Sequence, residues 1–133
     1  MSTKQTDQAF IVVADGIGAK FFRIPSNADK MTLIAEGVLL PTRLQDEGPS
    51  GKNPPERSHH ESDEATFAKQ LAHELYRRMH NNEFTSMILI ADPQTLGQMR
   101  PLLHKEVASR ISREIAKTLT KASHEDILKA IIA

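Results

Sequence analysis

One apolar segment of five residues, Met87–Ala91, constrains the fold of this chain more than any other. Its hydrophobicity is continuous rather than alternating, which is typical of a strand that is covered on both faces. The segment stops at Asp92-Pro93, where the aspartate suits the cap of a following helix and the proline suits that helix's first position. We therefore predict a central strand over residues 86–91, with further layers above and below it.

The first forty residues carry the pattern of an antiparallel meander. Apolar residues 10–14 and 19–24 flank a short link that contains glycine, which predicts a hairpin. Residues 31–40 read as a third strand, in which Gly37 marks a bulge or a bend. This half of the chain therefore supplies neighbouring antiparallel strands.

Helical periodicity dominates the second half of the chain. A helix is expected to begin at Ser62 or Asp63 and to end at Asn81-Asn82, because its apolar residues recur at helical spacing. The helix after Pro93 should kink or restart at Pro101, which lacks the N–H group that a helix interior needs. A last helix should begin at Ser123, with acidic residues in its first turn.

Residues 107–119 are ambiguous. Val107, Ile111, Ile115 and Leu119 recur every four residues, which favours a helix. The last three of these residues also share the parity of one strand face, so a strand is the alternative.

Residues 41–62 form a long irregular loop within what we predict to be a single domain, 1–133. The stretch has no periodicity and contains four prolines and two glycines. A loop of such length inside a compact domain is usually functional or disordered, so we expect a contact surface from Gly48 to His60. No metal site is predicted for His59-His60, because adjacent histidines rarely both bind one ion. The candidate binding residues of this loop are Asp46, Gly48, Gly51, Lys52, Arg57, His59 and His60.

Charge and composition narrow the class of function. The chain has no cysteine, which excludes disulfides and cysteine nucleophiles, and its formal net charge is zero. The segment 100–121 is nevertheless basic, with six Lys and Arg residues against two Glu residues. We predict anion contacts there at Arg110, Arg113 and Lys117. The polar start of the chain and the absence of a long apolar run predict a cytoplasmic protein without a membrane contact.

Catalytic chemistry has one candidate constellation. Asp15 and Asp92 each follow an apolar strand, and paired carboxylates at strand ends are typical of metal-dependent hydrolases of the ribonuclease-H type. Both residues also have ordinary explanations, as a turn residue and as a helix cap. We therefore expect no cofactor and no enzymatic activity, and keep the hydrolase as the alternative. Asp92 engaged in capping would remove that alternative.

Several segments, in order, resemble the bacterial host attachment protein family. They are Val12–Gly16 with Ala19–Phe22, Asp46–Lys52, Phe67-Ala68 with Leu71, Ile88–Pro93 with Leu96-Gly97 and Arg100, and Lys117–Thr120. That family is similar to the middle domain of archaeo-eukaryotic peptide-chain release factors.

The resemblance implies an α/β fold with a mixed central sheet of about five strands flanked by helices, similar to ribonuclease H. It also implies that residues 110–119 form a strand beside the central one. The long loop would take the place of the Gly-Gly-Gln tripeptide that release factors insert into the peptidyl-transferase centre, but here the loop reads Gly48-Pro49-Ser50-Gly51-Lys52. We therefore expect a non-catalytic binding or adaptor domain, with an unknown protein or a ribosome or RNA partner. The sequence leaves open whether the chain forms a homodimer.

Overall fold

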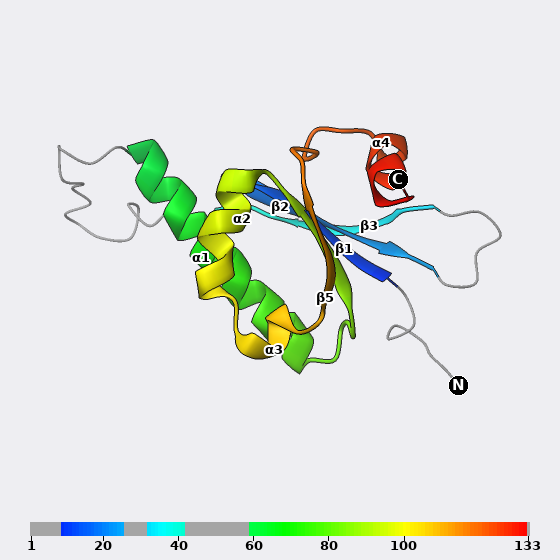
Figure 1. The fold of residues 1–133 in the computed structure, drawn as a ribbon, viewed down its shortest axis with the longest axis horizontal. Coiled ribbons are helices and arrows are strands. Elements are labelled where there is room, and N and C mark those ends of the chain that lie inside the picture. Colours follow the sequence, from blue (N-terminus) through cyan, green and yellow to red (C-terminus); the bar gives the residue numbers. More distant parts are fainter. Residues whose placement is uncertain (1–8, 26–31, 42–58, 133) are drawn as a thin grey trace.

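The computed structural model describes residues 9–25, 32–41 and 59–132, and residues 59–65 by their backbone alone. These residues form a five-stranded sheet in the order β3-β2-β1-β4-β5, with helices on both faces (Figure 1). The elements in chain order are β1 (Ala9–Asp15), β2 (Gly18–Ile24), β3 (Ile34–Leu39), α1 (His59–His80), β4 (Met87–Ala91), α2 (Pro93–Met99), the 3-10 turn η3 (Arg100–Leu102), α3 (Lys105–Ala108), β5 (Ile111–Ala116) and α4 (His124–Ile132).

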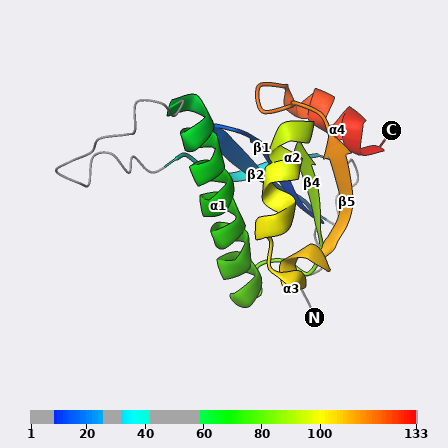
Figure 2. The ribbon, with the colours of Figure 1, turned by 60° about the vertical axis from the view of Figure 1, so that its left-hand side comes forward.

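The sheet is mixed, as predicted. Strands β1, β2 and β3 form the antiparallel meander, whereas β4 runs parallel to β1 on one side and to β5 on the other. Helices α1 and α2 cover one face of the sheet, and α4 covers the other (Figure 2). This is the α/β fold that the sequence and the family resemblance predicted.

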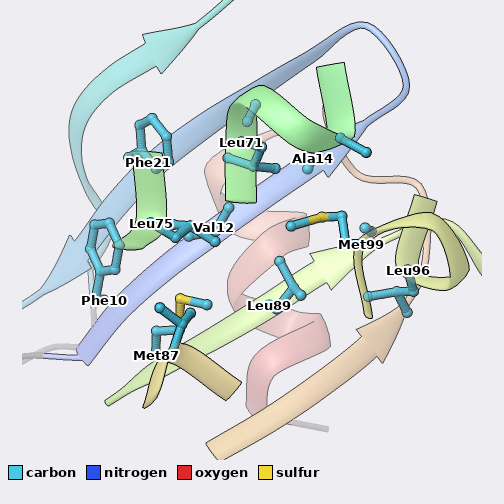
Figure 3. Packing of buried hydrophobic residues seen from close by; sticks show 14 of the residues in the cluster. Phe10, Val12, Ala14, Phe21, Leu71, Leu75, Met87, Leu89, Leu96 and Met99 are labelled. Carbon is cyan, nitrogen blue, oxygen red and sulfur yellow. The ribbon is translucent and has the colours of Figure 1, made fainter. Parts of the chain in front are cut away.

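Strand β4 is the covered central strand that its apolar run predicted. Leu89 packs in the cluster beneath α1 and α2, where Leu71 and Leu75 also lie (Figure 3). Ile90 points to the opposite face and packs with Ile127 of α4. Both Leu89 and Ile90 are fully buried. A continuous apolar run is thus required, because both faces of the strand meet helices.

The predicted bulge at Gly37 is confirmed. Phe21 pairs with Gly37 and Phe22 pairs with Ala35, so Glu36 is an extra residue in β3. Gly37 has a φ of 152°, a backbone conformation that residues other than glycine rarely adopt. The bulge frees the side chain of Glu36 to reach back over β2, where it meets Arg23.

Residues 107–119 are not one helix, so the expectation from four-residue spacing is wrong, and the strand alternative is confirmed for Ile111–Ala116. Val107 belongs to the single turn α3. Pairing between β4 and β5 shifts register after Met87. Because of that shift, Ile111 packs beneath α1 and α2, whereas Ile115 packs beneath α4. The four-residue spacing therefore serves two faces of a sheet rather than one face of a helix.

Helix boundaries agree with the predictions except at the start of α1. That helix begins at His59, not at Ser62 or Asp63, and no proline or glycine stands between His59 and Phe67 to stop it earlier. The predicted loop 41–62 therefore loses its last four residues to α1. The break at Pro101 is confirmed by the change from α2 to η3, and the Ser123 cap by a 3.1 Å hydrogen bond from Asp126 N–H to Ser123 Oγ.

Candidate interaction surface

The basic residues predicted to contact anions lie along β5, a strand at the end of the sheet. Arg110 directly precedes this strand, and its carbonyl accepts a 2.9 Å hydrogen bond from Met87 N–H. Arg113 lies within the strand, and Lys117 follows its last residue. Lys105 and Lys121 flank the same stretch of chain. We call these five residues, Lys105, Arg110, Arg113, Lys117 and Lys121, the β5 basic surface.

The side chains of this surface differ in whether they form hydrogen bonds or ion pairs within the protein. A guanidinium nitrogen of Arg113, Nη1, donates a hydrogen bond to the carbonyl of Ile131 at the end of α4, so this residue also holds α4 in place. Within the described ranges, the side chains of Arg110 and Lys117 have neither an ion pair nor a hydrogen bond. Arg110 is half-buried and Lys117 is exposed. These two cations are therefore available to an external anion.

Acidic residues of the same segment, 100–121, cancel only part of its positive charge. Glu114 is engaged by Arg100, whose Nη2 lies 2.7 Å from Glu114 Oε1. That hydrogen bond and the carboxylate charge raise the pKa of Arg100. Because Arg100 and Glu114 neutralise each other, the charged residues that remain in the segment 100–121 are the five cations of the β5 basic surface and Glu106. The segment thus keeps a net positive charge, although the formal net charge of the whole chain is zero.

The carboxylates of the alternative hydrolase site are adjacent in the fold but fully engaged. Ala14 pairs with Ala91, so Asp15 and Asp92 emerge side by side from neighbouring parallel strands. Asp92 Oδ2 accepts a 3.1 Å hydrogen bond from Thr95 N–H, and its Oδ1 accepts one of 2.7 Å from Thr95 Oγ1. The Asp92 cap is therefore confirmed.

Asp15 is held in the same way. Its Oδ1 accepts a 2.8 Å hydrogen bond from Ile17 N–H in the hairpin turn, and its Oδ2 accepts one of 2.6 Å from Thr120 Oγ1. All four carboxylate oxygens of Asp15 and Asp92 thus have protein donors. No group of three or more His, Asp or Glu side chains that could hold a metal occurs among the described residues. The hydrolase alternative loses its support, because Asp92 is engaged in capping α2.

The sequence analysis did not predict one polar cluster, which is centred on Arg23. Arg23 is 3% exposed, and its guanidinium binds Glu36 through two nitrogens, with distances of 2.9 and 3.0 Å. Its third nitrogen donates a 2.7 Å hydrogen bond to the carbonyl of Glu83, and its Cζ lies 4.7 Å from the centre of the Phe10 ring. The available signal was a charged residue inside the apolar run 21–24, because a buried charge requires partners. This cluster joins β2, β3 and the segment before β4, so its role is structural.

The structure describes only part of the predicted binding loop. Asp46, Gly48, Gly51, Lys52 and Arg57 lie outside the described residues. His59 and His60 were expected in the loop, but they form the first turn of α1.

No helix in the described part of the chain is long and apolar enough to span a bilayer.

Comparison with known proteins gives one family and several structures. The model of the family described as bacterial archaeo-eukaryotic release factor family 12 matches residues 8–131. A search of curated protein sequences finds no match. A crystal structure of the archaeal translation termination factor aRF1 is similar to 96% of this chain, with 13% sequence identity and a TM-score of 0.58. The match covers 35% of the aRF1 chain, so this chain spans about a third of that protein.

Two further structures are more distant. One is described as an archaeal protein, with 9% identity and a TM-score of 0.49 over 96% of this chain and 39% of that one. The other is the Ppx/GppA phosphatase of Aquifex aeolicus, with 11% identity and a TM-score of 0.44 over 82% of this chain and 35% of that one. The likeness to aRF1 establishes a shared fold.

Proposed function

Because the chain belongs to bacterial archaeo-eukaryotic release factor family 12, we propose that it is a non-catalytic, translation-related domain that binds the ribosome through RNA phosphates. The match extends over residues 8–131, so the described fold is the family's fold rather than an appendage to it. An effect on host attachment, which the sequence resemblance implied, would then follow indirectly from altered translation.

The proposal is for a binding domain because the expected catalytic groups are missing or engaged. The sequence has no two adjacent glycines, so it lacks the Gly-Gly-Gln tripeptide of release factors. Asp15 and Asp92 direct their carboxylate oxygens to protein donors. The first fact leaves peptidyl-tRNA hydrolysis without the catalytic tripeptide of release factors, and the second removes the support for a metal-dependent hydrolase.

The β5 basic surface is the single observation that supports an RNA partner. RNA offers a dense row of phosphates, and most contacts that position a protein on a nucleic acid go to phosphate and sugar. Arg110 can approach a phosphate with two guanidinium nitrogens, whereas Lys117 offers a point charge. Arg113 keeps further N–H donors beside the one that binds Ile131.

A second contact is proposed for the segment predicted as the contact loop. Lys52 and Arg57 supply two cations there, and Gly48 and Gly51 allow the backbone close approach to a partner. We propose Asp46, His59 and His60 as further partner contacts in this segment. The two histidines lie in the first turn of α1.

Binding to purified bacterial ribosomes, measured by co-sedimentation at increasing salt, tests the proposal. The double variant Arg110→Ala/Lys117→Ala should bind more weakly, and the slope of log affinity against log salt should fall by about 1 to 2, as for two lost phosphate contacts. The matched control is Lys69→Ala/Lys129→Ala, which removes the same charge from exposed residues of α1 and α4. It should leave the slope near that of the original protein.

Two results would reject the proposal. One is the absence of any salt-dependent binding by the original protein. The other is an equal loss of ribosome affinity in the two double variants, because that would show that binding depends only on the net charge of the protein. A third variant, Lys52→Ala/Arg57→Ala, measures in the same assay how much the predicted contact loop contributes to ribosome binding.

A further inference from the structure

Strand β3 presents an unusual edge. It is the last strand of the sheet opposite β5, and no strand in the described part of the chain pairs with its outer side. The described residues include six large hydrophobic side chains that are exposed, and four of them gather at this edge or at the hairpin next to it. These four are Ile17, Ile34, Val38 and Leu40, with exposed fractions between 50% and 66%.

The register shows that these side chains serve both faces of the sheet. Ile34 pairs with Arg23 and so shares the face of α1, whereas Val38 pairs with Lys20 on the face of α4. Leu40 approaches Gly18 at the hairpin, since a Cβ on that glycine would lie 3.6 Å from Leu40 Cδ2. A strand added beside β3 would therefore find apolar contacts above and below the new ladder, as in β-strand addition.

The two ends of the sheet differ in charge. Edge strands are normally protected from pairing by charged side chains, and β5 carries Arg113 and Glu114 with Lys117 just beyond it. The one charged residue of β3 is Glu36, and Arg23 binds its carboxylate with two nitrogens. The bulge at Glu36 interrupts the ladder but turns this charge inward. Edge β3 is thus left with backbone groups and apolar side chains.

The chain's own remaining segments are poor candidates to cover this edge. Segment 42–58 contains one large apolar residue, Leu44, among polar residues, prolines and glycines. Segments 1–8 and 26–31 each contain one methionine and no other large apolar residue. None of them has the alternating apolar residues that would match Ile34 and Val38.

We propose that β3 pairs antiparallel with β3 of a second copy of this chain, giving a two-fold dimer with one continuous sheet. A two-fold interface brings the same surface of each copy together, so it must be complementary to itself. Edge β3 meets that requirement because it holds no unpaired charge and its partner would supply apolar residues of the same kind. Since a single strand pair buries less than a standard interface, we expect a dissociation constant on the order of 10 µM.

Sedimentation equilibrium of the full chain over a range of concentrations tests this proposal. The variant Val38→Lys should weaken dimerisation at least about tenfold, because each dimer carries the substitution twice. The matched control is Ile132→Lys at the end of α4, where the side chain is 64% exposed against 61% for Val38. It should leave the dissociation constant within about twofold. Leu40→Lys provides a second disrupting variant if Val38→Lys fails to fold.

Hydrogen exchange supplies an independent readout. Those backbone amides of β3 that do not bond to β2 should become protected as the protein concentration rises, whereas the outer amides of β5 should not. If the chain stays monomeric at all concentrations and the outer amides of β3 remain unprotected, the proposal is overturned. The β3 edge would then have to bind a different protein. Equal effects of Val38→Lys and Ile132→Lys would also overturn it. These outcomes do not depend on ribosome binding, because the β5 basic surface lies at the other end of the sheet.

Discussion

Replacing Arg23 by methionine tests whether the buried arginine cluster stabilises the junction of β2, β3 and β4. Methionine keeps an unbranched apolar side chain of similar length, but it lacks the guanidinium carbon that lies 4.7 Å from the centre of the Phe10 ring. It removes the guanidinium group, and with it the two bonds to Glu36 and the bond to the Glu83 carbonyl. The change in unfolding free energy then reports chiefly on these polar contacts.

The expected loss is about 2 to 4 kcal/mol, from two contributions. The side chain of Glu36 is 29% exposed and can turn to water when its partner is removed, so its two bonds count for less than those of a buried pair. The carbonyl of Glu83 loses a donor in a part-buried position, which costs about 1 to 3 kcal/mol. The lost charge-assisted bonds to Glu36 add about 1 kcal/mol after that discount.

Equilibrium unfolding in urea, followed by circular dichroism, measures the effect. The matched control is Arg77→Met, which removes a guanidinium from an ion pair with Glu74 on the surface of α1, where the Arg77 side chain is 55% exposed. That variant should lose less than about 1 kcal/mol, as exposed pairs do. The reasoning is refuted if Arg23→Met stays within about 0.5 kcal/mol of the original protein, or if the two variants lose the same amount.

Two further predictions follow from the other polar contacts. Asp92→Ala should lower the unfolding free energy by about 1 kcal/mol, because Thr95 N–H loses the side-chain oxygen that caps it. Asp92→Asn keeps a side-chain oxygen and should retain most of that free energy. If urea unfolding shows the same loss for both variants, the capping role of Asp92 is contradicted. The pKa of Glu74 lies below its usual value of 4.5, chiefly because of the hydrogen bond from Arg77. Its contribution to stability is therefore complete above pH 4.5 and disappears as the pH falls through the lowered pKa. Between about pH 5 and pH 3 the original protein should lose more stability than Glu74→Gln, and parallel curves would contradict this.

Local patterns in the sequence were sufficient where one face or one residue controls the structure. The covered strand Met87–Ala91 followed from its continuous apolar run, because no other pattern buries both faces of a strand. The cap at Asp92, the break at Pro101 and the bulge at Gly37 followed from backbone constraints that act within a few residues. Periodicity failed at Ile111 and Ile115, since a shift in pairing with β4 sends these residues to opposite faces.

The candidate surface was less accessible to sequence reasoning. Arg110, Arg113 and Lys117 were identified by charge alone, but their placement along an end strand depends on the order of the sheet. The engagement of Arg113 by Ile131, and of Asp15 by Thr120, joins residues that are far apart in the chain. Such contacts leave no periodic signal, because each depends on how two separate elements pack.

Apart from Ile111–Ala116 and the start of α1, the sequence by itself determined which segments become strands and helices. It also determined which strand is covered on both faces, because those features depend on neighbouring residues. Only the tertiary structure decided that Asp15 and Asp92 hold protein donors, that Glu36 is neutralised by Arg23, and that one end of the sheet is charged while the other is apolar. These properties arise when distant segments share one sheet, and strand order is fixed by packing of the whole chain.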